Sequence, residues 1–121
     1  MTAVQKSEQP AHSVSIYLAG DLAMVKHYCL EFCRRGLCVT VTPVDFIYAG
    51  GAEAGVRIGL VNYPRFPALP HVIDETAEDL ARFLIERMHQ DTALIDAPDR
   101  TIWLTRRAGT LNNECEGMCG V

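Results

Sequence analysis

Apolar and polar positions along the 121-residue chain repeat with two periods, one typical of helices and one typical of strands. A first helix is predicted after Asp21, whose carboxylate is placed to accept the free N–H groups of the first turn, and it ends at Gly36, where a left-handed residue is expected. A second helix carries one apolar stripe. Its members are Ala77, Leu80, Ala81, Leu84, Ile85 and Met88. We expect Asp74 or Thr76 to cap it, because Thr76 and Asp79 have the spacing of a capping box.

Short runs that alternate, or that are rich in β-branched residues, predict the strands of a sheet. The runs are Val14–Ala19, Leu37–Thr42 with its continuation Val44–Tyr48, Val56–Tyr63, and Asp91–Asp96 with Thr101–Arg106. Pro43 interrupts the second run, which favours an edge strand or a bulge because proline has no N–H to donate. The glycine-rich segment 49–55 predicts the turn of a long hairpin.

The order strand–helix–strand–strand–helix–strand has approximate two-fold symmetry. It predicts an α+β, ferredoxin-like βαββαβ sandwich, in which two helices cover one face of a four-stranded antiparallel sheet. We divide the chain into a flexible N-terminal arm at residues 1–13, a single domain at residues 14–107 and a loose cysteine-containing tail at residues 108–121. A chain of this length has the common size of one domain.

Composition and charge argue against some classes of protein and of partner. Hydrophobic residues make up 49% of the chain and charged residues 21%, which is ordinary for a globular protein. The formal charge of −4 and the pI near 5.5 argue against a broad basic face, so we expect no nucleic-acid partner. No run approaches the ~18 apolar residues that cross a membrane, and the polar start lacks the apolar region of a signal peptide. We therefore expect a cytoplasmic protein with no membrane partner.

The five cysteines leave an odd number in a chain without an export signal, which favours reduced thiols or a metal site over a disulfide framework. Cys29 and Cys33 form one Cys-x-x-x-Cys pair, and Cys115 and Cys119 form another. Four thiolates suffice in number for a structural zinc. However, Cys29 and Cys33 also fall on the apolar stripe of the first helix, which favours core packing, and the tail pair has almost no apolar neighbours. We predict no cofactor and keep zinc as an alternative.

Asp21 stands where the first predicted strand ends and the first helix begins. This arrangement resembles the small CRISPR-associated nucleases of the Cas2 type, which share the predicted topology and use an aspartate at the end of the first strand. Asp21 alone matches that pattern. The resemblance implies a dimer and a divalent metal such as Mg²⁺ at Asp21, whereas the simpler interpretation is an N-cap that stabilises the helix by ~1 kcal/mol.

Two loops carry the residues that we expect to contact a ligand or partner. These residues are Tyr48, Gly50, Gly51, Tyr63, Arg65 and Phe66. The glycines allow backbone N–H groups to converge on an anion, although a plain hairpin turn explains them as well. The second loop combines aromatic rings and an arginine, which dominate binding hot spots, and its alternative is a hydrophobic loop that covers the open edge of the sheet.

The central block from Leu37 through Pro67 is similar to a small family of bacterial proteins of unassigned activity, which implies a shared fold and no catalytic residue. We predict a small cytoplasmic binding or regulatory module that works as a homodimer. A second copy usually covers the open face of such a sheet, or the edge beside Pro43. Two alternatives stay open: a divalent-metal-dependent nuclease or phosphodiesterase that uses Asp21, and a thiolate metal-binding or redox protein.

Overall fold

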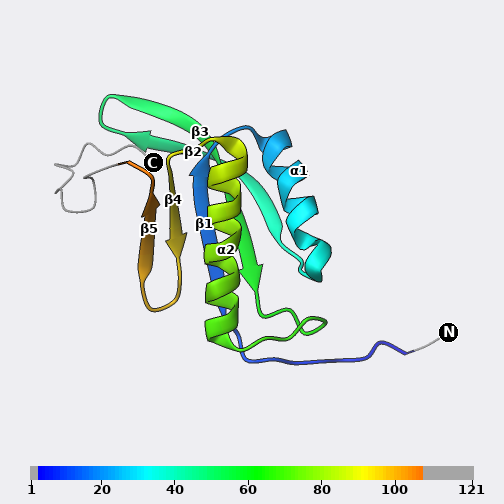
Figure 1. Ribbon diagram of the computed structural model, residues 1–121. Coiled ribbons are helices and arrows are strands. Elements are labelled where there is room, and N and C mark those ends of the chain that lie inside the picture. Colours follow the sequence, from blue (N-terminus) through cyan, green and yellow to red (C-terminus); the bar gives the residue numbers. More distant parts are fainter. Residues whose placement is uncertain (1–2, 108–121) are drawn as a thin grey trace.

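Two helices cover one face of a five-stranded antiparallel sheet in the structure, a computed structural model that describes residues 3–107 (Figure 1). The elements are β1 (Ser13–Ala19), α1 (Leu22–Phe32), the 3₁₀ turn η1 (Cys33–Arg35), β2 (Thr40–Tyr48), β3 (Gly51–Val61), α2 (Pro70–Met88), β4 (Thr92–Asp96) and β5 (Thr101–Thr105). The strands lie in the order β2-β3-β1-β4-β5. The α+β class is confirmed, whereas the prediction of four strands is wrong.

The additional strand arises because the last β-structure is a hairpin. Its two segments, β4 and β5, pair in antiparallel register around a turn, in which the N–H of Ala97 donates to the carbonyl of Arg100 at 2.9 Å. The other side of β4 pairs with β1. Hydrophobic pattern indicates β-structure on both sides of the turn, but it does not show that each segment becomes a separate member of the sheet.

The first helix begins as the sequence predicts, whereas α1 ends at Phe32 and the 3₁₀ turn η1 continues it to Gly36. The carboxylate of Asp21 accepts the N–H of Met24 at 3.0 Å, which is the expected N-cap hydrogen bond. Gly36 follows η1 with φ 96° and ψ 47°, a left-handed conformation that only glycine adopts without strain. Asp21 therefore fixes where the first helical segment begins, and Gly36 fixes where it ends.

The second helix begins earlier than predicted, and the proposed caps are wrong. It starts at Pro70 with Leu69 as N-cap, and no side chain caps it. Proline suits the first helical position, because the N–H that it lacks has no partner there in any helix. Thr76 lies inside the helix, and its hydroxyl donates to the carbonyl of Val72 at 2.8 Å. Asp74 is likewise inside the helix, so its carboxylate is available for a tertiary contact.

The β2–β3 hairpin is longer than predicted, because residues 51–55 belong to β3 rather than to the turn. Gly50 makes the turn with φ 90°. Gly55 lies in β3 beneath the ring of Phe46, where a Cβ atom would meet that ring and would lie 2.6 Å from the carbonyl oxygen of Leu18. Pro43 lies within β2, at the edge of the sheet as expected.

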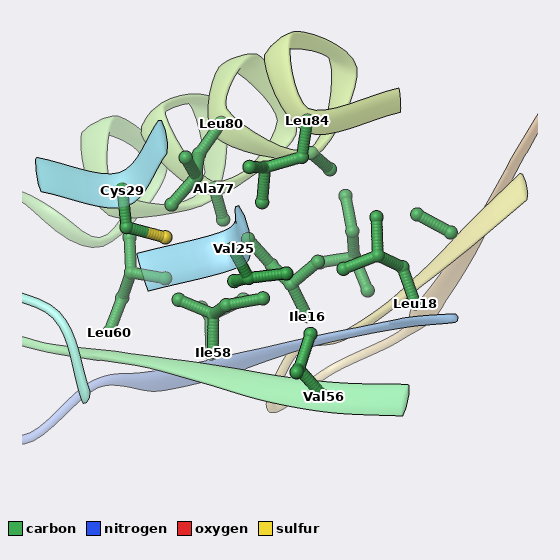
Figure 2. Packing of buried hydrophobic residues seen from close by; sticks show 14 of the residues in the cluster. Ile16, Leu18, Val25, Cys29, Val56, Ile58, Leu60, Ala77, Leu80 and Leu84 are labelled. Atoms are coloured by element: carbon green, nitrogen blue, oxygen red, sulfur yellow. The ribbon is translucent and has the colours of Figure 1, made fainter. Parts of the chain in front are cut away.

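Alternate residues of the central strands pack against both helices and form the core (Figure 2). Its largest fully buried side chains are Ile16, Leu18, Ile58, Leu60, Leu80, Leu84, Ile95, Val14, Val25 and Val56. Burial of one such side chain stabilises the fold by ~1.5–3 kcal/mol. The second predicted apolar stripe is buried throughout. Among residues 3–107 there is no helix that is both long and apolar enough to cross a membrane.

The opposite face of the sheet has no helix over it in the described part of the chain (Figure 1). One row of residues in register crosses all five strands on this face. The row is Thr42, Arg57, Tyr17, Leu94 and Trp103. Phe46 adds a second ring beside Tyr17, edge to face at 6.5 Å. We call this row together with Phe46 the open face.

Candidate functional site

A cavity of about 430 Å³ lies at one end of the domain, in the size range of small-molecule sites. We call it the His12–Asp74 cavity. Three separate segments form it: the end of the N-terminal arm, the first turns of α2 and the turn between β4 and β5. Its lining residues are His12, Pro70, His71, Asp74, Glu75, Glu78, Pro98, Asp99 and Arg100.

Asn62 fixes the arm at the mouth of this cavity. Its backbone N–H donates to the carbonyl of His12 at 3.0 Å, and its side-chain amide donates to the carbonyl of Pro10 at 2.8 Å. Its side-chain oxygen accepts the N–H of Ala68 at 3.1 Å, which ties down the loop that leads into α2. Asn62 therefore fixes the positions of both His12 and the loop that leads into α2. The predicted flexible arm therefore has a fixed C-terminal end.

Two mostly buried side chains of the lining meet each other, the imidazole of His12 and the carboxylate of Asp74. Nε2 of His12 and Oδ1 of Asp74 are 2.8 Å apart, and the side chains are 12% and 14% exposed. A guanidinium nitrogen of Arg100 lies 3.8 Å from the other carboxylate oxygen of Asp74. The contact holds the imidazole in one orientation, which suits an acid–base group.

Carboxylates outnumber cations around the cavity. Glu78 pairs with Arg82 at 2.9 Å, and Asp99 pairs with Arg100 at 3.1 Å. Glu75 is exposed at the rim and has no ion-pair partner among residues 3–107. Arg100 lies near both Asp99 and Asp74, so its single positive charge does not balance their two negative charges. The lining therefore keeps a net negative charge. The electrostatic potential in the cavity is therefore negative.

Sequence analysis missed this cavity. His12 and Asp74 are 62 residues apart, and the pattern places the first in an arm and the second at a helix cap. No local motif connects them, because their contact depends on the pairing of β1 with β3 and on where α2 begins. A spacing search among the histidines also fails, since the partner of His12 is a carboxylate rather than a second histidine.

Asp21, the predicted metal ligand, acts as the N-cap of α1. It also lines a hollow of about 350 Å³ together with Gly20 and Asp45. Two carboxylates therefore share this hollow. Among residues 3–107 there is no group of three or more histidine, cysteine or acidic side chains that could hold a metal ion. The Mg²⁺ site at Asp21 stays a prediction.

The cysteines of the first predicted pair lie in and beside the core. Cys29 is buried, as its position on the apolar stripe indicates, and burial raises the pKa of its thiol to about 12 (Figure 2). Cys33 is half-buried, and burial also raises the pKa of its thiol. Cys115 and Cys119 lie outside the described residues, so zinc binding by the two pairs stays a prediction.

The two predicted contact loops lie at opposite ends of β3 (Figure 1). At ~3.3 Å per residue, the eleven residues of β3 span ~35 Å, so one chain does not join the loops into a single surface. The first loop holds Tyr48, Gly50 and Gly51 at the hairpin end. The second is an exposed aromatic cluster of its own: the rings of Tyr63 and Phe66 are 6.0 Å apart, and the Arg65 guanidinium carbon lies 5.8 Å from the Phe66 ring centre. Their binding role stays a prediction.

No family model and no curated protein matches the chain. Two solved structures are similar to it. One is a phage SAM lyase in the apo state, with a TM-score of 0.68 and 13% identity, matched over 85% of this chain and 96% of that chain. The other is a phage SAM lyase in complex with S-methyl-5′-thioadenosine, with a TM-score of 0.61 and 12% identity, matched over 86% and 96%. These likenesses show a shared fold, and they give no support to the expected resemblance to Cas2-type nucleases.

Proposed function

We propose that this chain binds a sulfonium nucleoside of the S-adenosylmethionine class in the His12–Asp74 cavity and acts on it as a lyase. The proposal narrows the sequence-based prediction of a binding module to one ligand class. The fold shared with SAM lyase along nearly the whole of both chains suggests the ligand. The observation that carries the choice of site is the excess of carboxylates around the cavity, with Glu75 left without an ion-pair partner in the described part of the chain.

Charge complementarity supports this assignment. S-adenosylmethionine has a sulfonium cation, an ammonium group and a carboxylate, so most of its charged groups are attracted to an acidic lining. Glu75 is the carboxylate at the rim that is placed to meet one of these cations, and Arg100 is the lining cation for the ligand carboxylate. S-methyl-5′-thioadenosine keeps the adenosine but is a neutral thioether, so it lacks the groups that the carboxylates attract.

A lyase reaction at this site breaks one bond between carbon and the sulfonium sulfur. As this bond breaks, an oxygen of the ligand's own carboxylate attacks the same carbon of the amino-acid fragment and forms a C–O bond, which closes a lactone that keeps the ammonium group. The electron pair of the broken bond moves to sulfur, which loses its positive charge and leaves as the neutral thioether S-methyl-5′-thioadenosine. The negative lining then holds the thioether product less strongly than the substrate.

Calorimetric titration of the purified chain with S-adenosylmethionine and with S-methyl-5′-thioadenosine tests the proposal. We expect Glu75→Gln to weaken binding of the cationic ligand ~3–5-fold and to leave binding of the neutral thioether within ~1.5-fold, because one exposed ion pair of ~0.6–1 kcal/mol is lost. Asp79→Asn is the matched control, since it removes an exposed carboxylate of the same helix that does not line the cavity. Chromatography with mass detection of S-methyl-5′-thioadenosine tests the cleavage.

Two outcomes would overturn the proposal. One is the absence of any heat of binding with either ligand at millimolar concentration. The other is equal binding by wild type, Glu75→Gln and Asp79→Asn, which would move the ligand away from this cavity. Binding without formation of the thioether would keep the ligand class and remove the lyase assignment.

We also propose that a second copy covers the open face, which is the homodimer expected from the sequence. Tyr17, Leu94 and Trp103 place half-buried apolar side chains in one row there, and surfaces of this kind are typical of subunit contacts. Light scattering during gel filtration should give the mass of a dimer for wild type and of a monomer for Leu94→Lys. A wild-type monomer at all concentrations would contradict this proposal.

A further inference from the structure

A hollow of about 300 Å³ between α1 and the start of β2 is lined by three thiols. They belong to Cys29, Cys33 and Cys38. The sequence groups Cys29 with Cys33 by their spacing, whereas the fold brings Cys38 to the same place from the other side of the η1 turn. This site is separate from the His12–Asp74 cavity, with which it shares no lining residue.

The backbone places the sulfur of Cys33 against the peptide group of Cys38. The N–H of Val39, the residue bonded to Cys38, donates a hydrogen bond to that sulfur. The chain between the two cysteines folds back through Gly36 in the left-handed conformation, and the N–H of Leu37 donates to the Cys33 carbonyl at 3.2 Å. A disulfide requires that the two Cα atoms lie about 4.4–6.8 Å apart. Cys33 and Cys38 line the same hollow, so the fold brings their side chains to one place.

The three thiols differ in their access to solvent. Cys38 is exposed and Cys33 is half-buried, while only 3% of Cys29 is exposed. Burial raises the pKa of Cys29 to about 12, so its thiol stays protonated and unreactive at neutral pH. The proximity of Cys38 contributes to the raised pKa of Cys33, which agrees with the two sulfurs being near neighbours.

We propose that Cys33 and Cys38 are a modification site at which a low-molecular-weight disulfide, such as glutathione disulfide, forms an intramolecular disulfide bond. The thiolate of exposed Cys38 attacks one sulfur of the small disulfide, forms a mixed disulfide and releases one thiol. The thiol of Cys33, after loss of its proton, then attacks the Cys38 sulfur and releases the second thiol. The two protein thiols are oxidised by two electrons, and one small disulfide is reduced to two thiols.

The bond ties the C-terminal end of the first helical segment to the start of an edge strand. It leaves Cys29, the buried third thiol of the hollow, as a free thiol. The site is thus a covalent connection between helix layer and sheet that forms only under oxidising conditions.

Tryptic mapping without reduction tests the proposal on the full chain, because the cleavage sites separate the candidate pairs. Cys29 and Cys33 lie together in the peptide of residues 27–34, whereas Cys38 lies in the peptide of residues 36–57. Both tail thiols lie in the peptide of residues 108–121. After incubation with glutathione disulfide and blocking of free thiols, we expect peptides 27–34 and 36–57 to be linked in protein that runs as a monomer on a non-reducing gel.

Three variants identify the pair and its order of reaction. Cys29→Ser should keep the link, and Cys38→Ser should abolish it. Cys33→Ser should abolish it as well and accumulate glutathione on Cys38, because the second attack is then missing. The proposal is overturned if peptide 27–34 instead loses two hydrogens by itself, which indicates a Cys29–Cys33 bond, if the link occurs only between chains, or if peptide 36–57 stays unlinked.

Discussion

Gly55→Ala tests whether β1, β2 and β3 are packed as closely as the structure indicates. Gly55 pairs with Ala19 of β1 on one side and with Val44 of β2 on the other. An added methyl group would meet the ring of Phe46 and would lie 2.6 Å from the Leu18 carbonyl oxygen, closer than Cβ atoms approach in real proteins. The ring can move, but the carbonyl belongs to a strand that is paired on both sides.

Two opposing terms set the magnitude. Alanine restricts the unfolded chain more than glycine does, which by itself stabilises a strand position by ~0.5–1 kcal/mol. Overpacking of a closely packed site costs ~1–3 kcal/mol. We therefore expect Gly55→Ala to lower the free energy of unfolding by about 1–2 kcal/mol, measured by urea denaturation. Gly51→Ala is the matched control, since an added Cβ would meet only the exposed side chain of Tyr48, at 3.3 Å or more, and it should stay within ~0.5 kcal/mol of wild type.

A double-mutant cycle with Phe46→Ala separates the two contacts. If the ring supplies most of the strain, the double variant should lose about 1 kcal/mol less than the sum of the single losses. If the Leu18 carbonyl supplies it, the losses should add. A Gly55→Ala protein that is as stable as wild type, or more stable, would refute the packing of Phe46 over this glycine and the close approach of β1 to β3.

Three further predictions concern residues that the sequence singled out. Asp21→Ala should lower the free energy of unfolding by ~1 kcal/mol through loss of the N-cap, and it should leave binding of S-adenosylmethionine unchanged in the titration; a change in that affinity would contradict a purely capping role. Arg65→Ala should leave the melting temperature within ~1 °C of wild type, because the side chain is exposed, and a loss of several kcal/mol would make the loop structural. The buried thiol of Cys29 makes the free energy of unfolding depend on pH. Burial raises the pKa of the Cys29 thiol from 9.0 to about 12, so this thiol ionises at a lower pH in the unfolded chain than in the folded one. The stability that the protonated thiol confers is therefore fully present below pH 9 and is lost as the pH rises towards 12. Denaturation between pH 8 and 11 should therefore show a steeper loss for wild type than for Cys29→Ala, and equal slopes would contradict the burial of an ionisable thiol.

The sequence by itself determined the elements that depend on local chemistry. The start of α1 follows from Asp21 and the end of η1 follows from Gly36, because an N-cap hydrogen bond and a left-handed residue act within one turn of helix. The apolar stripe of α2 and the edge position of Pro43 follow in the same way from spacing and from a missing N–H. The start of α2 was misjudged because two helix-start signals compete there, and the proline at the first position prevailed over the capping-box pattern.

Only the tertiary structure decided which distant residues meet. The sheet has a fifth strand because β4 pairs with β5 on one side and with β1 on the other. The alternation of residues within one strand does not show which other strands it pairs with. His12 reaches Asp74 only because Asn62 ties the arm to the end of β3, and Cys38 reaches Cys33 only because a left-handed turn folds β2 back beside α1. His12 and Asp74 are 62 residues apart, and Cys33 and Cys38 are close in sequence but lie on either side of a turn, so the periodicity of a single helix or strand predicts neither contact. The candidate sites of this protein therefore depend on contacts between different segments. The helices and strands that bear the site residues depend instead on the local pattern of apolar, capping and turn residues.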